Sequence, residues 1–85
     1  MTMLAALLFA ASNSLAAIPM VDLERHYWDC NYAATQSMLD TVDAEFCSRV
    51  YERLKAEKFN GDYQKFMKWW ADNKTRENAA RAKKK

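Results

Sequence analysis

Four residues carry side chains whose types and spacing could do chemistry: His26, Asp29, Cys30 and Cys47. On a helix, His26, Asp29 and Cys30 would share one face, so an imidazole and a carboxylate would lie beside a thiol. Such a group could support acid-base or thiol chemistry, and together with Cys47 it could hold a metal ion. Oxidation of the two thiols to a disulfide would remove that thiol.

The two cysteines are nevertheless expected to form a structural disulfide. They lie too far apart for a Cys-x-x-Cys redox motif or for the close cysteine pair of a zinc knuckle, and His26 is the only histidine. The chain also has no glycine-rich phosphate loop and no serine, histidine and acid at a spacing that supports a triad. The sequence therefore predicts no enzymatic activity, no cofactor and no metal ion.

The N-terminal segment predicts export. An apolar run over residues 3–11 is followed by small residues at Ser14 and Ala16, as in the hydrophobic region and cleavage site of a secretory signal. Residues 1–16 are therefore the predicted signal peptide, and the predicted location is periplasmic or secreted, where a disulfide persists. No Lys or Arg precedes the run, so an uncleaved membrane anchor and an ordinary cytosolic N-terminus stay open as alternatives.

Residues 17–74 are predicted to form a single all-α domain. The whole chain contains 1 glycine and 1 proline, which leaves few sites for tight turns between strands. Apolar residues recur at steps of three and four, which indicates a buried stripe on each of three helices. The stripes are Leu23, Tyr27, Cys30, Ala34 and Met38 in the first helix, Phe46, Cys47, Val50, Tyr51 and Leu54 in the second, and Tyr63, Phe66, Met67 and Trp70 in the third.

Short polar segments divide the three helices. Asp22 is the expected N-cap of the first helix, and Asp62 is the expected N-cap of the third. The second helix is expected to be capped by Asp40, Thr41 or Asp43. The second helix should end near Lys58, with Asn60 or Gly61 in the left-handed conformation. Cys30 and Cys47 then fall at comparable heights on a helical hairpin. The predicted fold is this small helical hairpin, stapled by one disulfide, with a third helix packed across it.

Residues 75–85 form a basic tail that is predicted to fray into solvent. Residues 22–73 hold seven basic and ten acidic side chains, whereas residues 74–85 hold six basic side chains and one acidic one. Lys83, Lys84 and Lys85 are therefore candidate contacts for an acidic partner or, weakly, for an anionic membrane. The net charge of the chain is only +2, which disfavours a nucleic-acid partner.

The chain has more aromatic side chains than a core of this size can bury. Trp28, Tyr32 and Trp69 are expected to be partly exposed and are the candidate partner-binding residues. The predicted function is that of a small exported helical protein that binds an envelope or secreted protein and has no catalytic activity of its own. The alternative is an envelope-associated or membrane-surface peptide that uses the basic tail and the tryptophans.

Overall fold

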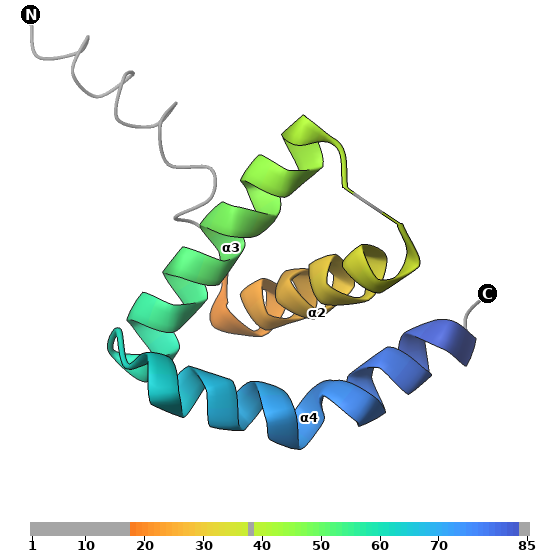
Figure 1. The fold of residues 1–85 in the computed structure, drawn as a ribbon. Helices are drawn as coiled ribbons and strands as arrows, with labels where there is room; N and C mark the ends of the chain where they lie inside the picture. The colour runs from red at the N-terminus through yellow and green to blue at the C-terminus, as the bar shows by residue number, and fades with distance from the viewer. Residues whose placement is uncertain (1–17, 38, 84–85) are drawn as a thin grey trace, which may run out of the picture.

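The protein is all-α, as predicted. The computed structural model describes residues 18–37 and 39–83, which form α2 (Met20–Gln36), α3 (Thr41–Phe59) and α4 (Tyr63–Lys83). Figure 1 shows α3 and α4 diverging from the turn that joins them, with α2 in the angle between them, where it packs against both. The predicted signal peptide lies outside the described residues, as do Met38, Lys84 and Lys85.

The first helix begins earlier than predicted. Pro19 is its N-cap, in an extended conformation, and the Pro19 carbonyl accepts a hydrogen bond from the Leu23 amide at 2.9 Å. Proline suits a helix start because its missing N–H would have no partner there. The prediction that Asp22 is the N-cap was therefore wrong. Asp22 lies inside the first turn, where it forms an ion pair with Arg25 at 2.9 Å.

The boundaries of the other two helices follow the predicted capping residues. The Asp40 carboxylate accepts from the Asp43 amide at 2.8 Å, and the Asp62 carboxylate accepts from the Lys65 amide at 3.1 Å. Between these two caps, Asn60 and Gly61 both have positive φ, at 54° and 80°. This left-handed turn lets the Gly61 amide reach the carbonyl of Lys55 at 2.9 Å, which closes the end of α3.

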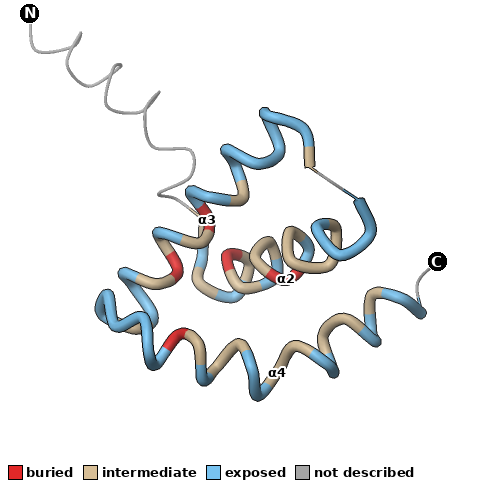
Figure 2. Tube along the Cα trace, in the orientation of Figure 1, coloured by how far each residue is buried: buried red, intermediate tan, exposed pale blue. Residues whose placement is uncertain are grey.

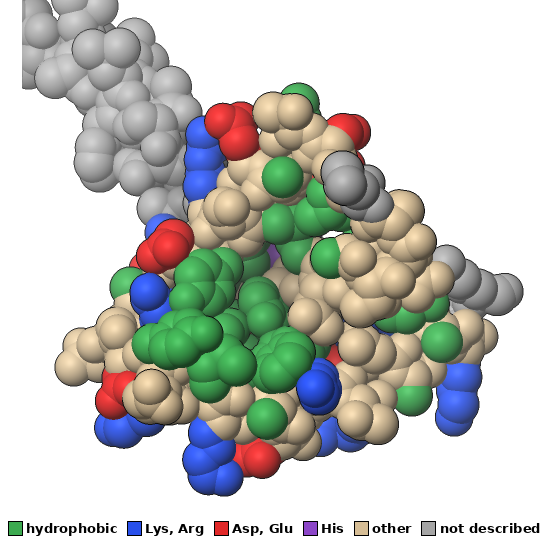
Figure 3. All heavy atoms as spheres, viewed as in Figure 1, with side chains coloured by type: hydrophobic (Ala, Val, Ile, Leu, Met, Phe, Trp, Pro, Cys, Tyr) green, Lys and Arg blue, Asp and Glu red, His purple; other side chains and the backbone are tan. Residues whose placement is uncertain are grey.

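The core lies where all three helices meet. Leu23 from α2, Val50 and Leu54 from α3, and Phe66 from α4 are buried and form one cluster (Figure 2). The Phe66 ring contacts four other aromatic rings from all three helices, at centroid distances between 5.0 and 5.9 Å: Tyr27, Tyr51, Phe59 and Trp69. Figure 3 shows hydrophobic side chains gathered over the corner where α3 meets α4.

Some predicted stripe positions are not covered in the structure. Ala34 is exposed, Phe46 is 39% exposed and Tyr63 is 51% exposed. Ala34 lies near the end of α2 and Tyr63 at the start of α4, whereas the Phe46 ring packs edge-on against His26 of α2 and stays partly open to solvent. Helical periodicity identifies a face, but only the crossing of the helices determines how much of its length is covered.

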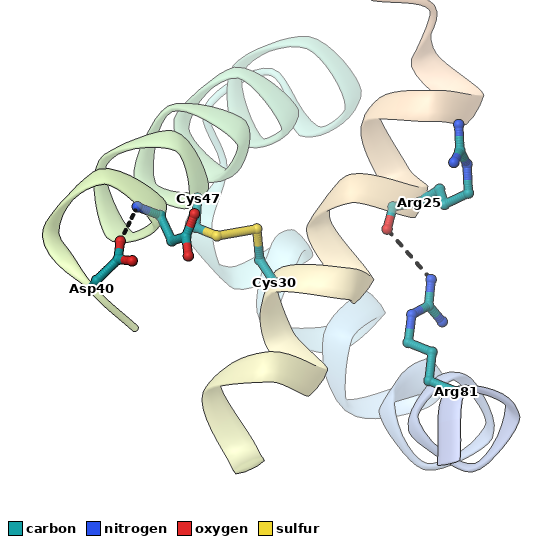
Figure 4. The surroundings of a disulfide bond; sticks show 6 residues. Arg25, Cys30, Asp40, Cys47 and Arg81 are labelled. Atoms are coloured by element: carbon teal, nitrogen blue, oxygen red, sulfur yellow. Dashed lines mark hydrogen bonds between the residues drawn. A yellow bond between two sulfur atoms is a disulfide. The ribbon is translucent and has the colours of Figure 1, made fainter. Parts of the chain in front are cut away.

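A disulfide joins Cys30 of α2 to Cys47 of α3, which confirms the predicted staple (Figure 4). The two Cα atoms are 5.8 Å apart, within the usual range for a disulfide. None of the helices in residues 18–37 and 39–83 has the length and apolar composition needed to cross a bilayer.

Candidate functional site

A groove lies between α2 and α4. Its volume is about 600 Å³, and the buried indole of Trp28 contributes to its wall. The groove has both apolar and charged lining residues: Val21, Glu24, Arg25, Trp28, Asp29, Tyr32, Glu77, Ala80 and Arg81. Val21, at 74% exposure, offers the most accessible large apolar side chain of this set. The groove therefore presents an apolar surface with charged groups around it.

Arg81 joins the two helices that form the groove. Its Nε donates to Asp29 Oδ1 at 2.8 Å, and one Nη donates to Glu77 Oε1 at 2.9 Å. The other Nη donates to the backbone carbonyl of Arg25 at 3.4 Å, which Figure 4 shows on the side of α2 away from the disulfide. Only 16% of the Arg81 side chain is exposed. Arg76 also pairs with Glu77, at 3.1 Å, so the two carboxylates of this cluster face two cations within the protein. Apolar contact is therefore the main attraction left for a ligand.

These contacts also explain why the expected frayed tail is absent over residues 75–83. Residues 79–83 have no large apolar side chain to bury, yet α4 continues as far as Lys83. In addition to the Arg81 cluster, Asn31 Nδ2 donates to Asn78 Oδ1 at 3.3 Å, and Trp70 Nε1 donates to Asn31 Oδ1 at 3.1 Å. The prediction of fraying was wrong for these residues because polar contacts between α2 and α4 order them.

The stability of the folded protein depends on pH through Glu77, one of the residues that line the groove. Burial favours the neutral carboxyl, but the hydrogen bonds from Arg81 and Arg76 outweigh it, so the pKa of Glu77 is lowered. The ionised carboxylate therefore stabilises the folded state above the unfolded-state pKa, and this contribution is lost as the pH falls through the folded-state pKa.

We expect Glu77→Gln to destabilise the protein by about 1 kcal/mol at pH 7 and by progressively less on acidification. Thermal unfolding of both proteins between neutral and acidic pH measures the difference. Glu45→Gln, at an exposed position of α3, controls for loss of one negative charge. A difference between the wild type and Glu77→Gln that grows as the pH falls would contradict the assignment.

The candidate partner-binding residues that the structure describes differ in burial and do not form one surface. Trp28 is only 3% exposed, so the expectation that it is partly exposed was wrong. Its ring packs on that of Trp69 at 5.1 Å, because α4 covers a second face of α2 in addition to the stripe that faces α3. Trp69 and Tyr32 are partly buried as expected, and Tyr32 lines the groove beside Trp28. Lys83 is exposed near the end of α4.

The reactive residues do not form a joint site in the oxidised protein. Both sulfur atoms are consumed by the disulfide, so neither cysteine offers a thiolate to His26. The His26 ring packs edge-on against Phe46 at 5.7 Å, while Asp29 belongs to the Arg81 cluster. Within the part of the chain that the structure describes, no cluster of three or more metal-ligating side chains is found.

Sequence reasoning missed several residues that form the groove. Val21, Ala80 and Arg81 were not singled out, because none belongs to a stripe or a motif. One signal was available, since Glu77 and Arg81 stand four residues apart, at the spacing of a helical ion pair. Nothing in the sequence indicated that Arg81 would also reach Asp29, 52 positions away.

Residues 18–37 and 39–83 thus form a small three-helix domain that is stapled by a disulfide and carries a groove between α2 and α4. Comparison with protein-family models, with curated proteins and with solved structures finds no match.

Proposed function

We propose that this is a small exported helical binding protein without catalytic activity of its own, which holds a segment of a larger envelope or secreted protein between α2 and α4. The observation that carries this proposal is the groove itself. It combines the highly exposed Val21 with the buried Trp28 and an Arg81 cluster that is already neutralised. An apolar side chain of a partner would gain contact area there without leaving a buried charge unpaired.

The proposed location outside the cytoplasm rests on the disulfide and on the N-terminal sequence. The Cys30–Cys47 bond is compatible with a periplasmic or extracellular location, where thiols are readily oxidised. A single staple also suits a protein of this size, because its small core contributes little stability.

The test places a photoreactive amino acid at Val21 of the full-length chain in its native host. Val42, on α3, is the matched control, because it is also a valine with 74% exposure but does not line the groove. We expect one defined adduct from Val21 and none of the same mass from Val42. Ala80→Trp, which fills the groove, should abolish the Val21 adduct. Equal crosslinking at both positions, or an adduct that survives Ala80→Trp, would contradict the proposal.

The alternative, a membrane contact through the tryptophans and the basic tail, receives less support. With 3% exposure, Trp28 cannot enter a bilayer while the protein is folded. Trp69 is partly covered by Trp28 and Phe59, at ring distances of 5.1 and 5.4 Å. A membrane contact by the folded protein would therefore have to use aromatic side chains other than Trp28.

A further inference from the structure

A second surface, which we call the tyrosine face, consists of Tyr27, Tyr51, Tyr63, Met67 and Trp70. Tyr27 from α2 and Tyr51 from α3 both pack edge-on against Phe66, at 5.4 and 5.0 Å. Tyr63, Met67 and Trp70 follow one another along a single side of α4 at steps of four and three residues. None of the five is fully buried, and Tyr63 is 51% exposed. The three helices thus build one continuous aromatic surface.

The Tyr27 phenol of this surface is neutral over the physiological pH range. Burial, with smaller effects from the neighbouring Tyr51 and Tyr63, raises the pKa of Tyr27 to about 12. Tyrosine and tryptophan rings combine an apolar body with a polar edge, so they are suited to a boundary between an apolar phase and water.

Two lysines flank the tyrosine face. The Lys74 ammonium lies over the Trp70 ring, 4.1 Å from its centroid, and the Lys55 ammonium lies 5.2 Å from the centroid of Tyr51. Glu52 is 3.7 Å from Lys55 and offsets part of its charge, whereas Lys74 has no carboxylate partner among the ion pairs of the described residues. In Figure 3, Lys and Arg side chains border the hydrophobic patch at the α3–α4 corner.

The tyrosine face draws most of its residues from the basic segment of the chain. Residues 18–51 contain two basic and six acidic side chains, whereas residues 52–83 contain nine basic and five acidic ones. Of the five residues of the tyrosine face, Tyr63, Met67 and Trp70 lie within residues 52–83, and Tyr51 directly precedes this segment. Two of these basic side chains, Lys55 and Lys74, lie against rings of the tyrosine face, so an anionic partner would meet positive charge there.

We infer that the tyrosine face is the surface by which the folded protein lies on an anionic phospholipid bilayer. Partly buried rings enter the headgroup region, and Lys74 and Lys55 extend to the lipid phosphates. Each lysine near an anionic surface adds only a modest attraction, so the binding is reversible and salt-sensitive. This function goes beyond the proposed protein contact and does not depend on it, because Val21 and Arg25 of the groove lie on another side of α2 from Tyr27.

The experiment is sedimentation of the full chain, in the form that its native host produces, with vesicles of phosphatidylcholine alone or mixed with phosphatidylglycerol. We expect binding only to the mixed vesicles at low salt. Lys74→Glu should weaken the binding by roughly tenfold to thirtyfold, because it replaces an attractive charge with a repulsive one. Lys65→Glu is the matched control. It makes the same change at an exposed position on the other side of α4 and should leave most of the binding intact.

Tyr63→Asp provides a second test, since it places a charge in the most exposed ring position of the face. It should also reduce binding, while circular dichroism verifies that the helices remain. Equal losses with Lys74→Glu and Lys65→Glu would overturn the assignment of the face. Binding to phosphatidylcholine alone would assign membrane affinity to the apolar N-terminal segment instead. Retention on immobilised polyglutamate, without vesicle binding, would reassign the face to an acidic protein. None of these outcomes affects the crosslinking test of the groove.

Discussion

Replacing Phe66 with alanine is expected to lower the free energy of unfolding by about 3–5 kcal/mol, the usual cost of removing a buried phenylalanine side chain. Phe66 is 3% exposed and its ring contacts aromatic rings from all three helices. The surrounding rings are held by separate helices, so they cannot all move inward to fill the cavity. For a domain of this size, such a loss is comparable to its total stability.

The measurement is urea unfolding followed by circular dichroism at 222 nm, the standard helix signal. Tyr63→Ala is the matched control, because it removes an aromatic ring one turn earlier on the same helix from a half-exposed position. We expect a loss of about 1 kcal/mol or less for this control. If the two variants were equally destabilised, Phe66 would not be the centre of the core.

Replacing both Cys30 and Cys47 with alanine is expected to destabilise the protein by about 3 kcal/mol, the value of the chain-entropy model for a loop of this length. The bond restrains the link between α2 and α3. The N-terminal half of α3 is largely exposed, so little burial holds it in place without the bond. Loss of the bond should therefore affect residues 41–49 before the core. Hydrogen exchange of the α3 amides, together with thermal unfolding, measures both effects.

Two controls make this prediction specific. Ala34→Ser alters an exposed position one turn beyond Cys30 and should leave thermal unfolding nearly unchanged. Mild reduction of the wild type should reproduce the effect of the double variant, and its intact mass should rise by one hydrogen for each sulfur. Equal stability of the oxidised and reduced proteins would show that the helices hold the hairpin without the bond.

Local signals predicted much of the architecture. The capping aspartates Asp40 and Asp62 and the Asn60–Gly61 turn mark helix ends, because their hydrogen bonds reach only three to six residues along the chain. The apolar stripes identified Leu23, Val50, Leu54 and Phe66 as core residues, and all four are buried. The disulfide was predictable because the signal-like N-terminal segment favours oxidised cysteines and only one pairing of two cysteines exists.

The candidate surfaces were less predictable, because each depends on contacts between residues distant in sequence. Trp28 was expected to be partly exposed since it lies off the predicted stripe of α2, but α4 covers that side. Tyr63 was assigned to the core from its spacing, yet it lies beyond the zone where the helices meet.

The amino-acid sequence by itself determined three helices, their capped ends and the cysteine pair, since these follow from local hydrogen bonding, helical periodicity and composition. Only the tertiary structure decided that α4 crosses α2 on a second face, joined by Arg81 to Asp29 at 2.8 Å. That crossing buries Trp28, orders residues 75–83 and opens the groove. The physical reason is that the sequence of a helix defines which of its faces are apolar. The angle at which a second helix crosses the first determines which of those faces are covered.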